Sequence, residues 1–272
     1  MRISFIGGGN MASALIGGLL AKSDAPRPTI SVVEPLAAQR SSLAARFAVQ
    51  CHEQPTSEAL AADVVVLAVK PQQMREAASA CAGHVAGALV ISVAAGIRIA
   101  DLQRWLKGHS RIVRAMPNTP ALIGLGITGL CAAPGASESD RASAERILQA
   151  AGETVWVSDE SLIDAVTAVS GSGPAYVFRF IEAIEQAGMA LGLTAEQSRR
   201  LTLATFVGAS RLAAQSDEPP SVLRERVTSK GGTTAAALAV MDAAQIGDIM
   251  QRALKAACDR GHEMGEEFGR QA

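Results

Sequence analysis

The chain has 272 residues, enough for one large domain or two modest ones with a buried core. Its 25 Lys and Arg residues nearly balance its 26 Asp and Glu residues, and aromatic residues make up only 3%, which argues against a nucleic-acid partner and for a small molecule. Hydrophobic residues make up 49%, but no apolar run approaches the roughly 18 residues of a membrane span, so no membrane partner is expected.

The first part of the chain alternates short β-rich runs with helical patterns, which is typical of βαβ units and a parallel sheet. Strands are predicted over Arg2 to Ile6 and Thr29 to Val33, with a helix over Asn10 to Ala21 between them. A helix over 36–47 and a short strand near Val49 follow, and then strands over 63–68, 88–93, 111–116, 126–131 and 154–157. The run at 63–68 is apolar on both faces, which predicts a sheet covered by helices.

After about Ser158 the pattern becomes helical to the end of the chain. Pro174 marks the start of a helix to about Gly188, and Thr194 caps a helix to about Gln215. A turn is predicted over 217–220, and the last helices over 234–240 and 245–268. Two domains are therefore expected, an α/β domain over 1–158 and an all-helical domain over 159–272.

A glycine-rich turn, Gly7-Gly8-Gly9-Asn10-Met11-Ala12, joins the first strand to the first helix. In this context it matches the Gly-x-Gly-x-x-Gly/Ala fingerprint, in which glycines allow a tight turn and bring backbone N–H groups and the helix end close to a pyrophosphate. Residues 1–158 are thus predicted to form a Rossmann-like domain that binds NAD or NADP. Its first cofactor contacts would be Gly7, Gly8, Gly9, Asn10 and Met11.

Glu34 ends the second strand, where an acidic side chain bonds the adenosine ribose of NAD and repels the 2′-phosphate of NADP. This position favours NAD. A Glu34 that faces solvent, or a phosphate contact from Gln39 or Arg40, leaves NADP open.

The carboxyl ends of the predicted strands share one character, because each is small, turn-forming or polar. In an open α/β sheet the ligand lies over these ends, so they are expected to line a groove for the cofactor. The candidates, besides the glycine turn and Glu34, are Ala68, Val69, Lys70, Pro71, Val93, Ala94, Ala95 and Asn118.

Two segments interrupt the helical half. Ser170-Gly171-Ser172-Gly173-Pro174 combines hydroxyls with glycines and permits close approach of a ligand, although a plain helix break is the alternative. The segment from Thr228 to Thr234 holds four hydroxyl residues around Gly231 and Gly232 before an alanine-rich helix, whose free N–H groups would bind a carboxylate.

The chain resembles the pyrroline-5-carboxylate reductase family over essentially its full length. The matching stretches are Phe5 to Met11, Ala68 to Gln72, Met116 to Pro120, Asp164 to Tyr176 and Val227 to Thr234. The resemblance implies reduction of L-1-pyrroline-5-carboxylate to L-proline by NADPH or NADH, and a helical domain that interleaves with a second subunit. Dimers, and their assembly into decamers, are implied in the same way.

Carried over by resemblance, Gly231, Gly232, Thr233 and Thr234 would hold the substrate carboxylate, with Ser172 as a further substrate contact. Thr234, or secondarily Thr233, would bond the ring nitrogen, so these two are the catalytic candidates; orientation supplies much of the rate. Two positions depart from the family, which commonly has Ser, Thr or Arg where Glu34 stands. Its asparagine before the third helix has no clear match around Pro55 to Ser57.

The sequence leaves two alternative functions to compare with this one. A β-hydroxyacid-type dehydrogenase uses a lysine on the first helix of its second domain, but no lysine occurs between Lys107 and Lys230. A non-catalytic NAD(P)-binding sensor needs no second anion site, so the segment from Gly231 to Thr234 argues against it.

The sequence has four cysteines that lie far apart and without metal-ligand spacing, Cys51, Cys81, Cys131 and Cys258. This spacing predicts a cytoplasmic protein that binds no metal.

Overall fold

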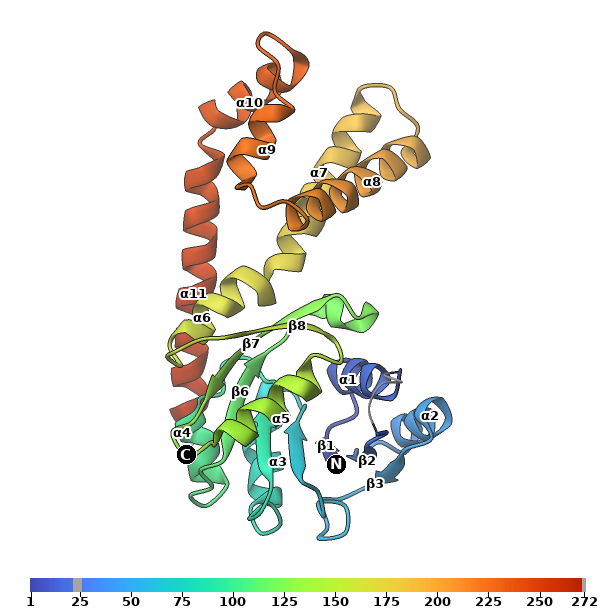
Figure 1. Ribbon diagram of the computed structural model, residues 1–272, viewed down its shortest axis with the longest axis vertical. Helices are drawn as coiled ribbons and strands as arrows, with labels where there is room; N and C mark the ends of the chain where they lie inside the picture. The colour runs from blue at the N-terminus through green and yellow to red at the C-terminus, as the bar shows by residue number, and fades with distance from the viewer. Residues whose placement is uncertain (22–25, 271–272) are drawn as a thin grey trace. The chain divides into compact units, whose positions relative to one another are not determined.

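The computed structural model describes residues 1–21 and 26–270, which form two compact units (Figure 1). Unit 1 comprises Met1–Ser172 and Ala256–Ala272, and unit 2 comprises Gly173–Lys255. The predicted domains, 1–158 and 159–272, follow the change in sequence pattern instead. Residues 159–172 and the end of the chain belong with the sheet because Ile163 and Phe268 are buried in its core.

Unit 1 is built on one eight-stranded sheet with the order β3-β2-β1-β4-β5-β6-β7-β8. The first six strands are parallel, β7 is antiparallel to β6, and β8 is parallel to β7. The predicted α/β fold is confirmed, with the last two strands at the edge. The strands are β1 (Arg2–Ile6), β2 (Thr29–Val33), β3 (Gln50–His52), β4 (Val64–Leu67), β5 (Leu89–Ser92), β6 (Ile112–Met116), β7 (Gly126–Ala132) and β8 (Gly152–Trp156).

Helices connect these strands and cover the sheet. The bounds of α1 (Asn10–Ala21) and α2 (Ala37–Phe47) agree within one residue with those predicted from the sequence. The others of unit 1 are α3 (Met74–Cys81), α4 (Ile99–Trp105), α5 (Glu138–Leu148) and α6 (Leu162–Val166), with 3-10 turns η1 (Pro71–Gln73) and η2 (Thr119–Ile123) and a π-helical turn η3 (Thr167–Gly171).

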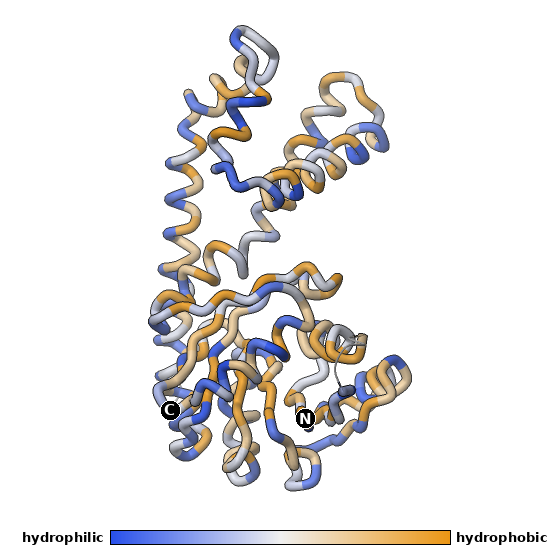
Figure 2. The backbone as a smooth tube through the Cα atoms, in the orientation of Figure 1, coloured by the Kyte–Doolittle hydropathy of each residue, from blue (hydrophilic) through white to orange (hydrophobic). Residues whose placement is uncertain are grey.

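The core of unit 1 lies on both faces of the sheet. Every residue of β4 is buried, as its apolar sequence predicted, and its side chains alternate between the faces. Val65 and Leu67 join a cluster with Phe268 of the C-terminal helix, whereas Val64 and Val66 join one with Leu15 of α1. Figure 2 shows the hydrophobic colour of the central strands. Because hydrophobic clusters cover both faces of the sheet, a ligand has access to it at the carboxyl ends of the strands.

Unit 2 is helical throughout. It contains α7 (Gly173–Ala190), α8 (Ala195–Ala214), α9 (Pro220–Arg226) and α10 (Thr233–Ala243), and the long α11 (Ile246–Arg270) continues from it into unit 1 after Lys255. Thr194 caps α8 as predicted, in a reciprocal arrangement with Gln197. The predicted turn at 217–220 leads into α9, a helix that the sequence pattern did not reveal. None of the helices in residues 1–21 and 26–270 is long and apolar enough to cross a membrane.

The C-terminal part of α11 is anchored in unit 1. Gly261, Gly265 and Phe268 are buried along one side of the helix. Arg98 donates a hydrogen bond to the carbonyl oxygen of His262 (3.1 Å), and Arg104 donates one to that of Gly269 (2.9 Å). These contacts make the end of the chain part of the structure that supports the sheet.

Candidate active site

A cavity of about 560 Å³ lies in unit 1 at the carboxyl ends of β1, β2 and β4. It lies where the strand order reverses, since β1 has β2 on one side and β4 on the other. Seven of the predicted cofactor residues come together in its wall: Gly7, Gly8, Gly9, Glu34, Ala68, Val69 and Lys70. The reversal point of such a sheet is where a dinucleotide binds.

The glycine turn is dictated by its neighbours. Gly7 has a φ of +93°, and a Cβ on it would lie 2.8 Å from the carbonyl oxygen of Ala68. Its N–H donates to the carbonyl oxygen of Val33 (2.8 Å), which ties β1 to β2. In contrast, no atom of the described residues lies within 4 Å of the place that a Cβ on Gly9 would occupy. The turn is therefore tight at Gly7 and open at Gly9, which leaves backbone accessible at the start of α1.

Glu34 is buried beneath this turn and is 8% exposed, so the alternative that it faces solvent is wrong. One carboxylate oxygen accepts from the N–H of Gly8 (3.0 Å) and the other from the N–H of Leu36 (2.9 Å). The side-chain amide of Gln39 donates to the carbonyl oxygen of Gly8 (2.6 Å). The N–H and the carbonyl oxygen of Gly8 are therefore both engaged within the protein. The backbone N–H groups that remain for an anionic ligand are those at Gly9 and at the start of α1.

The charge around this end of the cavity is mainly negative. Glu34, Glu53 and Glu76 line it, whereas Lys70 is the one cation that the described part of the chain contributes to its lining. Arg40 lies next to it, but its guanidinium donates to the carbonyl oxygens of Glu34 (2.8 Å) and Pro35 (2.7 Å) and pairs with Glu53 (3.3 Å). Neither Arg40 nor Gln39 is therefore a free phosphate ligand in this structure.

Other predicted cofactor residues lie outside this cavity. Val93 and Ala95 follow β5 and are half-buried, whereas Ala94 is buried in the core. Met11 lies in the first turn of α1 and Pro71 begins η1, while Asn10 lines a different cavity. Their cofactor contacts stay predictions.

Asn118 is buried and its side chain is engaged within the protein. Its amide nitrogen donates to the carbonyl oxygen of Ser170 (3.1 Å), and its amide oxygen accepts from the N–H of Ile127 (3.0 Å). It joins η3 to the end of β6, so a structural role is observed and its contact with a cofactor stays a prediction.

In the segment from Ser170 to Pro174, the π-helical turn η3 ends at Gly171, and α7 begins at Gly173 after an interruption at Ser172. The predicted helix break is therefore present, and the approach of a ligand there stays a prediction. A Cβ on Gly171 would lie 2.5 Å from the terminal methyl group of Met116, so that side chain would have to move. The N–H of Ser172 donates to the carbonyl oxygen of Thr167 (2.8 Å), and the Ser172 hydroxyl has no hydrogen-bond partner among the described residues. The π-turn thus presents a hydroxyl that is available to a ligand.

The diglycine segment forms the start of α10. Gly231 has a φ of +74°, and Gly232 is the N-cap residue, so no side chain caps the helix. In the first hydrogen bond of the helix, the N–H of Ala236 donates to the carbonyl oxygen of Gly232 (3.1 Å). The N–H groups of Thr233 and Thr234 therefore have no partner within the helix. Thr234 is half-buried and Thr233 exposed. An uncapped helix start with two adjacent hydroxyls suits a carboxylate.

The sequence did not reveal the part of the cavity wall that comes from α3. Ala77 and Ala80 of this helix line the cavity, together with Leu36 and Pro55. Met74, Ala78 and Cys81 are the buried residues of α3, and their helical spacing is the signal that locates it. Within residues 1–21 and 26–270, no three His, Cys, Asp or Glu side chains form a group that could hold a metal ion.

Comparison with known proteins covers both halves of the chain. A family model described as pyrroline-5-carboxylate reductase dimerisation matches residues 160–264, and one described as NADP oxidoreductase, coenzyme F420-dependent, matches residues 2–96. The chain is 45% identical to the pyrroline-5-carboxylate reductase of Pseudomonas aeruginosa over 98% of each protein.

Solved structures agree with this. The structure of a pyrroline-5-carboxylate reductase from Coxiella burnetii matches with a TM-score of 0.90 at 40% identity, over 96% of this chain and 97% of that one. The pyrroline carboxylate reductase of Plasmodium falciparum with NADP bound matches with a TM-score of 0.85 at 29% identity, over 97% and 98%. This chain belongs to the pyrroline-5-carboxylate reductase family.

Proposed function

We propose that this protein reduces L-1-pyrroline-5-carboxylate to L-proline with NADH or NADPH, the last step of proline synthesis. Relatives that are named for this reaction and match the chain nearly end to end support the activity. The structural observation that carries the proposal is the uncapped start of α10 at Gly231 to Thr234. A protein that only senses a dinucleotide has no need of this second anion site.

The cavity at the strand ends is the proposed dinucleotide site. A reduced nicotinamide bound there supplies the hydride that adds to the imine carbon. The open backbone at Gly9 and the first N–H groups of α1 would bind the pyrophosphate, and Ala68 to Lys70 would lie along the dinucleotide. Met11, Pro71, Asn118 and residues 93–95 are proposed to contact it beyond the cavity described above.

We propose that the enzyme prefers NADH, although it accepts either dinucleotide. The negative charge of Glu34, reinforced by Glu53 and Glu76, opposes a 2′-phosphate, and Arg40 is already bonded to backbone and to Glu53. The remaining lone pairs of Glu34 can accept from the hydroxyls of the adenosine ribose.

The substrate carboxylate is proposed to bind the N–H groups of Thr233 and Thr234 beside Gly231 and Gly232. The Thr234 hydroxyl, or secondarily that of Thr233, would bond the ring nitrogen, and Ser172 would add a further contact. Because a protonated cyclic imine is already electrophilic, these residues contribute orientation more than proton transfer.

We propose that two copies of the chain associate through residues 159–272, as the match to a dimerisation family supports. Unit 2 exposes large apolar side chains, including Phe178 of α7 and Leu201 of α8, and α7 and α8 border an apolar groove of about 160 Å³. The solution mass decides between a dimer and the decamer that the family resemblance implies. All four cysteines are free thiols, which supports the cytoplasm as the proposed location.

The function is tested by following the absorbance of NADH or NADPH after adding the imine to the purified protein. We expect oxidation of the dinucleotide that depends on the imine and yields proline. Binding of NADH without any imine-dependent oxidation would overturn the reductase and leave the sensor.

The role of Thr234 has its own test. Thr234→Ala is expected to lower kcat at least tenfold, because one positioned hydrogen bond to a charged group is worth about 1.5–3 kcal/mol. The NADH dissociation constant, measured by fluorescence titration, should not change. Thr234→Ser keeps the hydroxyl and should keep most of the activity; wild-type kinetics in Thr234→Ala would remove the role.

A further inference from the structure

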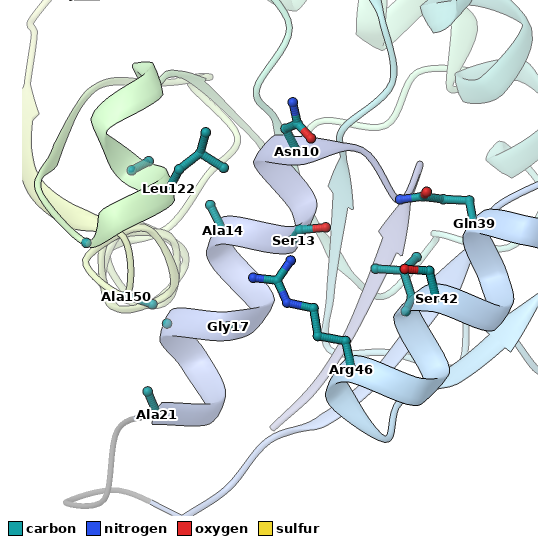
Figure 3. A pocket seen from close by; sticks show the side chains of 14 residues that line it. Asn10, Ser13, Ala14, Gly17, Ala21, Gln39, Ser42, Arg46, Leu122 and Ala150 are labelled. Atoms are coloured by element: carbon teal, nitrogen blue, oxygen red, sulfur yellow. The ribbon is translucent and has the colours of Figure 1, made fainter.

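A second cavity, of about 330 Å³, lies in unit 1 between α1, α2 and η2 (Figure 3). Asn10, Ser13 and Gly17 contribute to it from α1, and Gln39, Ser42 and Arg46 from α2. In Figure 3, Arg46 extends from α2 toward α1, and Ser13 faces it. The proposed reaction uses none of this polar wall except Asn10, a predicted cofactor contact.

Several polar side chains in this wall have hydrogen-bonding groups that contact no partner among the described residues. Arg46 contacts the ring of Phe47 at 4.7 Å and forms no ion pair or hydrogen bond with any residue of the described ranges. The side chains of Asn10, Ser13 and Ser42 also have no hydrogen-bond partner there. Among the residues that the structure describes, no Asp or Glu lines the cavity, and Arg46 is the one charged side chain in its wall. Such a set of donors fits an anion, because a guanidinium bonds carboxylate or phosphate oxygens in pairs.

The size of the cavity indicates the class of ligand. Small-molecule sites have volumes of about 300–1,000 Å³, and this cavity lies at the lower end of that range. It therefore suits a small metabolite with a carboxylate or phosphate group.

Gln39 links this cavity to the glycine turn. It lines the second cavity, and its amide donates to the carbonyl oxygen of Gly8 (2.6 Å), a residue in the wall of the dinucleotide cavity. Leu43 also lines the second cavity and is the nearest neighbour of a Cβ placed on Gly8. A ligand that bonds Gln39 competes with this hydrogen bond and alters how firmly the turn is held.

We propose that the cavity beside Arg46 is a regulatory site for a small carboxylate or phosphate metabolite, whose binding changes the affinity for the dinucleotide. Linkage requires the effect to be reciprocal, so NADH changes the anion affinity by the same factor. The effect on NADH rests on the proposed function, whereas anion binding at Arg46 does not.

The experiment is isothermal titration calorimetry of the full-length protein with inorganic phosphate and with citrate, with and without saturating NADH. Saturation keeps the probes out of the dinucleotide cavity, and the two probes distinguish phosphate from carboxylate chemistry. We expect at least one probe to bind the wild type at millimolar concentration, and Arg46→Gln to weaken it at least tenfold. Arg146→Gln is the matched control, because Arg146 also lies exposed in the last turn of a unit 1 helix, α5, outside the cavity. It should bind the probe within twofold of the wild type.

The coupling is read from the NADH dissociation constant at zero and saturating probe. Gln39→Leu should abolish the difference seen in the wild type. The site is disproved if neither probe binds the wild type, or if a correctly folded Arg46→Gln protein, judged by circular dichroism, binds the probe as the wild type does. An NADH affinity that the bound probe leaves unchanged would disprove the regulatory role. None of these readouts uses turnover, so a failure to reduce the imine does not affect them.

Discussion

Glu34 shows how one side chain serves both structure and charge. Its two oxygens accept from the N–H groups of Gly8 and Leu36, so it braces the glycine turn against the start of α2. It also places a buried negative charge at the end of β2. Any substitution there therefore changes the shape of the turn and the charge of the site together, and the two effects need separate readouts.

We expect Glu34→Gln to lower kcat/KM for NADH about tenfold and to raise the NADPH-to-NADH ratio, because it removes a charged acceptor worth about 1.5–3 kcal/mol. Steady-state kinetics with both dinucleotides measure the ratio. Glu53→Gln is the comparison, since Glu53 lines the same cavity but its side chain is 67% exposed, and it should raise the ratio less than Glu34→Gln does. An unchanged ratio in Glu34→Gln would contradict discrimination by Glu34.

Adjacent glycines in α1 should respond in opposite ways to the same change. A Cβ on Gly18 would overlap the carbonyl oxygen of Ala150, whereas a Cβ on Gly17 would lie 3.4 Å from the ring of Phe47, an ordinary contact. Gly18→Ala should destabilise unit 1 by about 1–3 kcal/mol through overpacking. Gly17→Ala should stabilise it by about 0.5–1 kcal/mol, since glycine is unfavourable inside a helix. Urea unfolding compares the two variants, and the same change in the free energy of unfolding for both would show that the contact of position 18 with Ala150 is unimportant.

Among the elements, α5 has a start that depends on ionisation. Ser137 and Asp140 cap it reciprocally, and Arg111 donates two hydrogen bonds to the Asp140 carboxylate, at 2.7 and 3.2 Å. The Arg111 guanidinium, helped by the Ser137 hydrogen bonds, lowers the pKa of Asp140 from 3.8 to about 2. A lowered folded-state pKa stabilises the protein above the unfolded-state value and stops doing so as pH falls through the folded-state value.

The wild type should therefore exceed Asp140→Asn in free energy of unfolding by about 2 kcal/mol at neutral pH. The difference should shrink as the pH falls below about 4 and vanish only below about pH 2. Urea unfolding at several pH values measures it. Asp159→Asn is the comparison, because Asp159 is exposed and accepts hydrogen bonds from the nearby Ser161, so its loss should change the stability much less than Asp140→Asn does. A difference independent of pH would show that Asp140 acts by shape alone.

Elements with a strong local signal could be predicted from sequence. β4 consists of four buried apolar residues in succession, and α8 is preceded by Thr194, a residue type that commonly caps helices. α4 and α9 are each seven residues long, too short to display a helical period, so their existence depends on tertiary packing.

The part of the site that could be predicted from sequence consists of contiguous motifs, namely the glycine turn and the segment from Gly231 to Thr234. The bonds from Glu34 and Gln39 to Gly8 join residues far apart in the chain, and only the fold places them together.

For the whole molecule, the exposed apolar surface of unit 2 indicates self-association. Leu201 of α8 is 57% exposed and borders the groove between α7 and α8. Leu201→Glu should lower the mass measured by light scattering from a multiple of 28.0 kDa toward 28.0 kDa, because a carboxylate in an apolar interface is costly. Arg200→Glu introduces the same charge at the neighbouring, exposed position and should leave the assembly intact. An unchanged mass in Leu201→Glu would place the contact elsewhere.

The return of α11 into unit 1 has a consequence for biosynthesis. Phe268 belongs to the core that β4 and β5 share, so the dinucleotide-binding part lacks a piece until Phe268 has been translated. The helices of unit 2 emerge from the ribosome earlier and are complete by then. A nascent polypeptide stalled just before Ala256 would thus carry helices α7 to α10 on a sheet whose core is unfinished.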